Sequence, residues 1–203
     1  ISVFTVAGPK ESEGPIGDFI EKKLTDDKYG EKTFEKAEKK ILSEAIENVV
    51  KVSDKEFSDI DALIAGDLLN QIISSSFSAR DFKIPFIGVY SACSTMSESI
   101  ALAASFIDDG KMENVICATG SHFASAERQY RYPLELGSTR PPQSQWTVTG
   151  AGACIISKSE AVRPIAGSNP YIESATFGKV VDYGVTDANN MGAAMAPACA
   201  DTM

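Results

Sequence analysis

The sequence predicts an α/β domain, and three observations lead to this prediction. Short runs of apolar and β-branched residues, such as residues 61–66 and 114–119, are typical of buried strands. Longer stretches with apolar residues at helical spacing lie between such runs, so strands and helices alternate along most of the chain. The 203 residues are 43% hydrophobic, which is enough for one domain with a substantial core.

The first quarter of the chain is predicted to hold a strand, an exposed excursion and a surface helix. Residues 1–6 alternate like a strand, and residues 7–30 are rich in glycine, proline and charge. From residue 33 the period becomes helical, with lysine and glutamate on the face opposite the apolar residues. The apolar positions of this helix are Phe34, Ala37, Ile41, Ala45 and Val49.

The next segments are predicted to alternate between strands and helices. Residues 53–59 indicate a short capped turn and residues 61–66 a buried strand. Residues 70–82 favour a short polar helix, and residues 84–90 favour another strand. These elements fit the alternation expected of an α/β domain.

A second long helix is predicted over residues 95–108, and it is almost entirely apolar or small. Glu98 is its only charged residue before its end, so this helix is expected to be enclosed by other layers. A strand over residues 114–119 follows. The segment 120–146 shows no clear period, and loops of that length in compact domains are usually functional or mobile.

The last part of the chain is predicted to hold two strands and the start of a helix. Residues 147–157 and 171–181 have strand character, and they flank a loop over residues 158–170. A final helix is expected to start within residues 187–192.

Charge and hydropathy argue against several classes of function. The formal net charge is −9 and the sequence pI is about 4.7, so we expect no nucleic-acid partner and repulsion from an anionic membrane surface. No apolar run approaches the length of a membrane-spanning helix, and the start of the chain lacks the pattern of a signal peptide. We therefore expect an intracellular protein without a transmembrane segment.

The cysteines divide into three in apolar surroundings and one at a corner. None of the four belongs to a CxxC pair, so neither a metal site nor a thioredoxin-like site is expected. Cys117, Cys154 and Cys199 lie in apolar or small-residue runs and are expected to be buried.

Cys93 lies where a predicted strand runs into the apolar helix. Residues 95–98 fit the capping-box pattern, which predicts that the helix begins at Thr95 and leaves Cys93 just outside its N-terminus. Free amides and the helix dipole favour a thiolate at such a position. The corner therefore either presents a nucleophile or holds a small buried cysteine.

The order of strand, cysteine and apolar helix resembles the thiolase and β-ketoacyl synthase superfamily, in which this cysteine attacks an acyl thioester. More specific strings run in order through the chain and resemble the stage V sporulation protein AD family. These strings are AGDLLNQ (65–71), ACST (92–95), SH (121–122), AERQYRYP (126–133), TVTG (147–150) and MGAAMAPA (191–198).

The resemblance implies a thiolase-like half with a mixed sheet, layered α-β-α, with a buried central helix. Residues 1–165 would form the N-terminal half, and residues 166–203 the truncated beginning of a second half. In the superfamily the acid–base residues come from the second half, and His122 does not correspond to them. No catalysis and no cofactor are therefore expected, and Cys93 would be a vestigial nucleophile that lines a pocket.

The resemblance also implies a function, which is binding of dipicolinic acid, alone or as its calcium chelate, for uptake into developing spores. The implied partners are membrane components of the same spore transport system and a second copy of the chain in a homodimer. The implied location is inside the sporulating cell, peripheral to the spore inner membrane. Two alternatives stay open, namely acyl transfer with Cys93 as nucleophile and a purely structural subunit with a vestigial pocket.

Arginines and tyrosines in the long segment suit a flat dicarboxylate. Arg128 and Arg131 are interleaved with Tyr130 and Tyr132. Guanidinium groups bind carboxylates through two hydrogen bonds, and aromatic faces stack on a planar ring. The alternative is a surface or dimer-interface loop in which these arginines pair with nearby glutamates.

Three further polar residues are candidates for contact with the ligand. Asp67 and Asn70 follow the strand that ends at Gly66, and loops after such strands face the ligand side of open α/β sheets. Helix capping by Asp67 is the alternative. His122 either contacts a ligand carboxylate or is a hydrogen-bonded loop residue.

Overall fold

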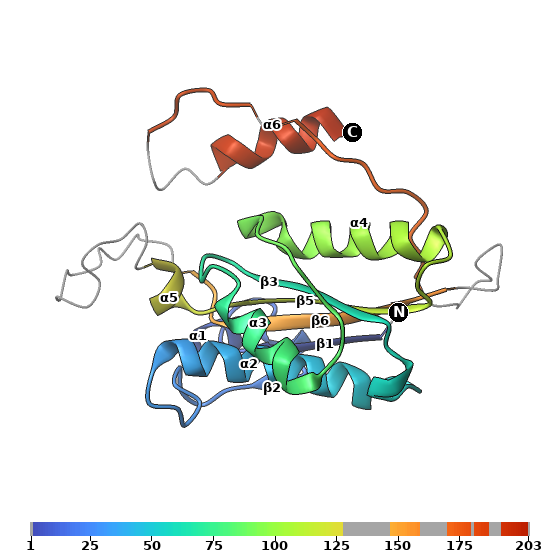
Figure 1. Ribbon diagram of the computed structural model, residues 1–203. Helices are drawn as coiled ribbons and strands as arrows, with labels where there is room; N and C mark the ends of the chain where they lie inside the picture. The colour runs from blue at the N-terminus through green and yellow to red at the C-terminus, as the bar shows by residue number, and fades with distance from the viewer. Residues whose placement is uncertain (1, 128–146, 159–169, 180, 187–191, 203) are drawn as a thin grey trace.

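The chain folds into three layers with a mixed sheet in the middle, as the α/β prediction requires (Figure 1). In the computed structural model, α4 (Thr95–Asp108) covers one face of this sheet. The other face is covered by α2 (Phe34–Lys51) and α3 (Ile73–Phe82). The structure describes residues 2–127, 147–158, 170–179, 181–186 and 192–202.

The described sheet has six strands in the order β2-β1-β6-β5-β3-β4. Five of them run in the same direction, and they include two parallel groups, β3 with β4 and β5, and β1 with β2. β6 then runs antiparallel to its two neighbours, β5 and β1, and this makes the sheet mixed. The strands are β1 (Ser2–Ala7), β2 (Lys22–Lys23), β3 (Ala62–Asp67), β4 (Phe86–Gly88), β5 (Asn114–Ser121) and β6 (Gly150–Ser157).

The surface helix predicted from residue 33 is confirmed as α2. Thr33 caps it, because its hydroxyl accepts a hydrogen bond from the Lys36 amide at 3.3 Å. Its apolar stripe packs on the sheet, where it forms one core with residues of β1, β3, β5 and β6. The stripe positions Ala37, Ile41, Ala45 and Val49 are fully buried.

Helix α4 has the predicted bounds, but only one of its faces is fully buried. Thr95, Ser99, Ala103 and Ile107 lie on that face, and a second core forms between α4 and the sheet. Ile100, Leu102 and Phe106 flank that face and pack against the same core, and they are partly buried. Ser97, Ser105 and Asp108, on the outer side of the helix, are exposed. The described residues therefore bury the sheet side of α4, as the prediction of a buried helix requires, and cover its outer side only in part.

Two segments differ from their predicted structure near the start of the chain and before α3. Residues 7–30 form more than an exposed excursion, since they contain α1 (Pro9–Ser12), the 3₁₀ helix η1 (Gly17–Phe19) and β2. The Leu24 side chain in this segment reaches the core and is buried. The helix predicted from residue 70 begins only at Ile73, because Gln71 and Ile72 adopt positive φ angles of 55° and 64° that no helix tolerates.

The last predicted strand is wrong for the residues that the structure describes. Residues 171–179 have no regular secondary structure and are largely exposed, because they have no neighbouring strand to pair with. The final helix is confirmed as α6 (Gly192–Thr202), which lies on the α4 side of the molecule (Figure 1). Most of the predicted loop 158–170 lies outside the described residues. None of the helices in the described ranges combines the length and apolar content that a membrane crossing requires.

Candidate ligand site at the corner between strand and helix

Cys93 lies at an exposed corner between β4 and α4. It belongs to the short 3₁₀ helix η3 (Ala92–Ser94), and its side chain faces solvent. Ala92 has a φ angle of 46°, which is a strained conformation for a residue with a Cβ atom. The corner is held in place by Ser91, whose hydroxyl lies 2.7 Å from the Ser94 hydroxyl. A strained, well-fixed corner next to a solvent-facing thiol is typical of a functional site.

The helix after this corner starts at Thr95 as predicted, but the predicted capping box does not form. Thr95 is the first helical residue rather than the cap, and its hydroxyl accepts a hydrogen bond from the Ser91 amide at 3.3 Å. Ser94 holds the cap position without a capping hydrogen bond from its side chain. No side chain therefore caps the start of α4, although the Thr95 amide already donates to the Ala92 carbonyl of η3. Amides at a helix start are natural donors to a carboxylate.

The corner packs directly against the carboxyl end of β3. Gly66 has no room for a side chain there, because an added Cβ atom would lie 2.0 Å from the Val89 carbonyl oxygen and 2.8 Å from Cγ2 of Thr95. Because β3, β4 and β5 are parallel, their carboxyl ends lie at the same edge of the sheet. Figure 1 shows the start of α4 and helix α5 (Phe123–Glu127) at this edge.

Asp67 lies at this edge, but its carboxylate is turned inward and caps α3. The residue is fully buried, and its two oxygens accept hydrogen bonds at 3.0 Å from the amides of Ser74 and Ser75. Burial raises the pKa of the Asp67 carboxyl, and the two amides oppose that rise. The structure therefore favours the helix-capping alternative, because the Asp67 carboxylate is buried and faces α3 rather than the corner.

Asn70 is also turned away from the corner, toward a buried glutamate. Its Nδ2 donates to Oε2 of Glu38 at 3.0 Å and to the Ser74 hydroxyl at 3.2 Å. The Ser125 hydroxyl of α5 donates to the same Glu38 oxygen at 2.6 Å. Glu38 thus joins α2, the turn before α3, and α5 through one buried oxygen atom.

Burial raises the pKa of Glu38 to about 8, and the hydrogen bonds from Ser125 and Asn70 only partly oppose that rise. The sequence interpretation missed this residue, because it assigned the lysines and glutamates of α2 to the solvent face. A signal was present, since Glu38 precedes Ile41, Leu42 and Ala45 at spacings of three, four and seven residues.

His122 is a buried, hydrogen-bonded residue, as one of the two sequence alternatives held. Its Nδ1 accepts a hydrogen bond from the Ala124 amide at 3.2 Å, so its Nε2 carries the proton and donates to the Asp27 carbonyl at 2.8 Å. Phe34 and Phe123 pack against the ring, each with its centroid 5.0 Å away. Burial lowers the pKa of His122, so the ring is neutral and has no free nitrogen for a ligand or for Cys93.

The remaining predictions concern three cysteines and two arginines. Cys117 and Cys154 are buried as expected, and they face each other across β5 and β6. Cys199 is exposed, contrary to expectation, because most of α6 remains open to solvent. Arg128 and Arg131 lie outside the described residues, although α5 places the preceding residue, Glu127, at the same edge as Cys93.

A mixed sheet between helical layers, with a cysteine at a strand-to-helix corner, is the arrangement of a thiolase-like fold. Solved structures support this fold class. A single-substitution variant of OleA from Xanthomonas campestris is 15% identical, with a TM-score of 0.53 over 79% of this chain and 58% of that chain. The 3-oxoacyl-[acyl-carrier-protein] synthase III from Aquifex aeolicus VF5 is 16% identical, with a TM-score of 0.51 over 79% of this chain and 54% of that chain. At such identities the likeness shows the fold alone.

Sequence comparison narrows the class to one family. The family model for stage V sporulation protein AD (SpoVAD) matches residues 1–203. The stage V sporulation protein AD of Bacillus subtilis (strain 168) is 43% identical over 202 residues, which cover 100% of this chain and 58% of that relative. The chain therefore belongs to the stage V sporulation protein AD family, and it spans little more than half the length of this relative.

Proposed function

We propose that the chain acts in sporulation by binding dipicolinic acid, alone or as its calcium chelate, without catalysing a reaction on it. The family supplies the sporulation role, and the resemblance of the sequence supplies the ligand. The ligand would lie at the corner between β4 and α4 as it is taken up into developing spores. The homodimer, the membrane partners, the division near residue 165 and the location at the spore inner membrane stay predictions.

One observation carries the proposed place of binding. The exposed Cys93 and the uncapped start of α4 lie at the same sheet edge as α5, after which the sequence continues into Arg128 and Arg131. Amides at a helix start and guanidinium groups both donate to carboxylates. Dipicolinic acid is a flat ring with two carboxylates, and an acidic protein needs such a local cluster of donors to hold it.

The geometry also supports a role without catalysis by this chain. A cysteine nucleophile needs a base to accept its proton and an acid to return one, and these transfers are worth about 10²–10⁴-fold in rate. His122 is the one histidine of the sequence, and both of its ring nitrogens are engaged by the backbone. The exposed Cys93 at a helix start is the observation that keeps acyl transfer as the second candidate.

Calorimetric and enzymatic measurements separate the two candidates. We expect saturable heat on titration with dipicolinic acid and much weaker binding of pyridine-2-carboxylic acid, which keeps the flat ring but has only one of the two carboxylates. We expect cleavage of acetoacetyl-coenzyme A to stay at the level of the Cys93→Ala control. Turnover above that control would establish acyl transfer, and a flat titration with dipicolinic acid would refute the binding proposal.

A further inference from the structure

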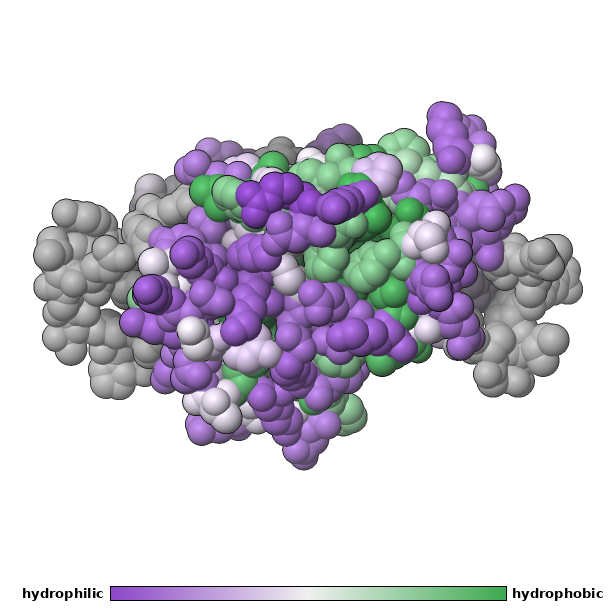
Figure 2. All heavy atoms as spheres, turned by 60° about the horizontal axis from the view of Figure 1, so that its bottom comes forward, coloured by the Kyte–Doolittle hydropathy of each residue, from purple (hydrophilic) through white to green (hydrophobic). Residues whose placement is uncertain are grey.

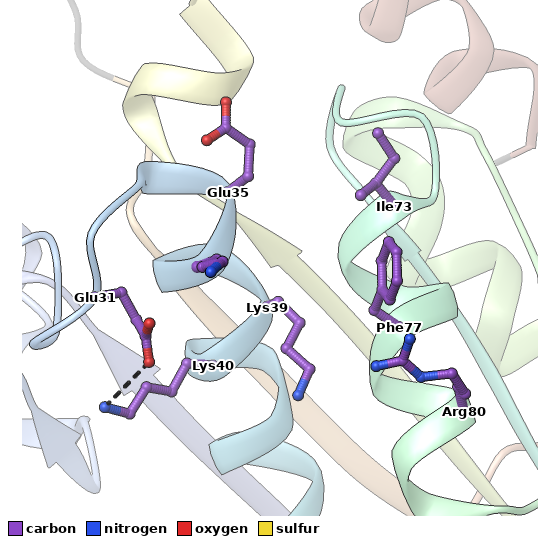
Figure 3. A pocket seen from close by; sticks show the side chains of 8 residues that line it. Glu31, Glu35, Lys39, Lys40, Ile73, Phe77 and Arg80 are labelled. Carbon is purple, nitrogen blue, oxygen red and sulfur yellow. Dashed lines mark ion pairs between the residues drawn. The ribbon is translucent and has the colours of Figure 1, made fainter.

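A groove of about 540 Å³ runs between α2 and α3, on the face of the sheet opposite α4. Figure 3 shows side chains from both helices along its walls. Figure 2 shows the face that carries these helices, which is mainly hydrophilic but includes an apolar area. The groove is lined by Glu31, Glu35, Lys36, Lys39, Lys40, Ile73, Phe77 and Arg80.

The groove exists because α2 and α3 meet through small residues. The Ser43 and Ser78 hydroxyls lie 3.0 Å apart at this contact, and the Ser78 hydroxyl also donates to the Ser74 carbonyl at 2.8 Å. Ser74, Ser78 and Ala79 are buried in the contact. The helices therefore approach closely at the floor, while the long side chains of both helices stand apart above it.

The α3 wall of the groove is an apolar strip that faces solvent. Ile73 and Phe77 are four residues apart, so they share one side of the helix, and they are 43% and 47% exposed. The Arg80 guanidinium lies 4.8 Å from the centre of the Phe77 ring and extends the strip with a cation. Such a strip matches two apolar side chains on successive turns of a second helix.

The α2 wall is basic although the chain as a whole is acidic. Lys36, Lys39 and Lys40 line the groove with Arg80, against two acidic residues, Glu31 and Glu35. Lys40 lies 3.7 Å from Glu31. Asp81, just outside the groove, pairs with Lys39 at 2.5 Å and with Arg80 at 3.0 Å. Counting Asp81 with these six groups still leaves a positive excess, in a chain whose net charge is −9.

We propose that this groove docks an acidic amphipathic helix of a partner protein. Two apolar side chains of that helix, four residues apart, would pack on Ile73 and Phe77. Aspartate or glutamate side chains on its flank would face Lys36, because Lys39 and Arg80 already pair with Asp81. The lining spans only about two turns of each helix, so the interface is small and the complex transient. The groove lies between α2 and α3, on the face of the sheet opposite α4.

Fluorescence anisotropy with a labelled helical peptide of about four turns, roughly 14 residues, tests this proposal. The peptide carries leucines at two positions four residues apart and glutamates along one flank. We expect Phe77→Ala to weaken its binding about tenfold, because an aromatic anchor at the centre of an interface is worth more than about 1 kcal/mol. Phe19→Ala, which removes a remote ring that is 81% exposed, is expected to change nothing.

Charge reversal tests the other wall of the groove. Lys36→Glu is expected to weaken binding several-fold at low salt, whereas Lys111→Glu on the α4 side changes net charge equally and should bind like wild type. Circular dichroism checks that each variant is folded. A peptide with lysines in place of the glutamates should bind far less. Equal binding of both peptides, unchanged affinity in both groove variants, or binding only to anionic lipid vesicles would overturn the proposal.

Discussion

The Glu38→Gln variant is expected to lose most of the alkaline decline in stability that the wild-type protein shows. The folded state holds the Glu38 proton up to a pKa of about 8, while an unfolded glutamate releases it near 4.5. Between these two pKa values only the folded state keeps the proton of Glu38. The contribution of Glu38 to the free energy of unfolding is therefore full below pH 4.5 and is lost as the pH rises through 8. The total is on the order of 5 kcal/mol, of which about 1 kcal/mol is lost between pH 7 and pH 9.

Glutamine is the matched replacement because both hydrogen bonds fall on one oxygen of Glu38. Its amide oxygen can accept from Ser125 and Asn70 as Oε2 does, and its amide group takes the place of the protonated oxygen. Glu38→Ala instead leaves both donors unpaired around a cavity, and we expect it to lower the free energy of unfolding by about 2–4 kcal/mol.

Urea unfolding at pH 7, 8 and 9 measures the effect of Glu38. Measurements above pH 7 separate the effect of Glu38 from that of His122. Because the pKa of His122 is lowered in the folded state, His122 reduces stability only as the pH falls below about 6.5. Glu47→Gln, on the same helix but with a side chain that is 45% exposed, is the control and should keep the wild-type decline. An undiminished decline in Glu38→Gln would show that another group carries it.

Removing Arg128 or Arg131 is expected to weaken the binding of dipicolinic acid about ten- to a hundredfold. Each charge-assisted hydrogen bond to a carboxylate is worth about 1.5–3 kcal/mol. Two observations support this expectation. Arginine side chains bind carboxylates, and both residues follow α5 in the sequence, which lies at the same sheet edge as the start of α4. Calorimetric titration of Arg128→Ala and Arg131→Ala, with and without calcium, measures the loss, which should appear at both calcium levels.

Arg80→Ala is the matched control for these two variants, because it removes the same charge from α3, outside the proposed ligand site. It should bind dipicolinic acid as the wild type does. Wild-type affinity in both Arg128→Ala and Arg131→Ala would move the ligand away from this segment and favour the alternative of a surface or interface loop.

The parts of the fold that follow from local periodicity could be predicted from the sequence. The start of α2 at Phe34 and both bounds of α4 agree with prediction, because helix ends and apolar stripes are encoded by residues close together in the chain. The prediction of a strand over 171–181 was wrong because strand formation depends on residues that are distant in the sequence. A strand needs a partner far away in sequence, and composition alone does not supply one.

The contacts of the polar site residues were also difficult to predict, because they join residues that are far apart in the sequence. Asp67 was placed at the correct edge of the sheet, but the direction of its carboxylate depends on where α3 begins, and two positive φ angles set that point. Glu38 was missed because its partners, Asn70 and Ser125, are 32 and 87 residues away. Sequence pattern locates such groups on an element, and only the packing between elements shows what they contact.

Alkylation of Cys93 in the presence of dipicolinic acid tests the central claim most directly. Iodoacetamide should label Cys93 and Cys199 in the native protein, while Cys117 and Cys154 stay protected by burial. A ligand at about ten times its dissociation constant should slow labelling of Cys93 about tenfold, because it leaves about a tenth of the sites free. Cys199, on α6, is the internal reference and should react at its original rate. Equal labelling of Cys93 with and without bound dipicolinic acid would contradict a ligand site at the corner between β4 and α4.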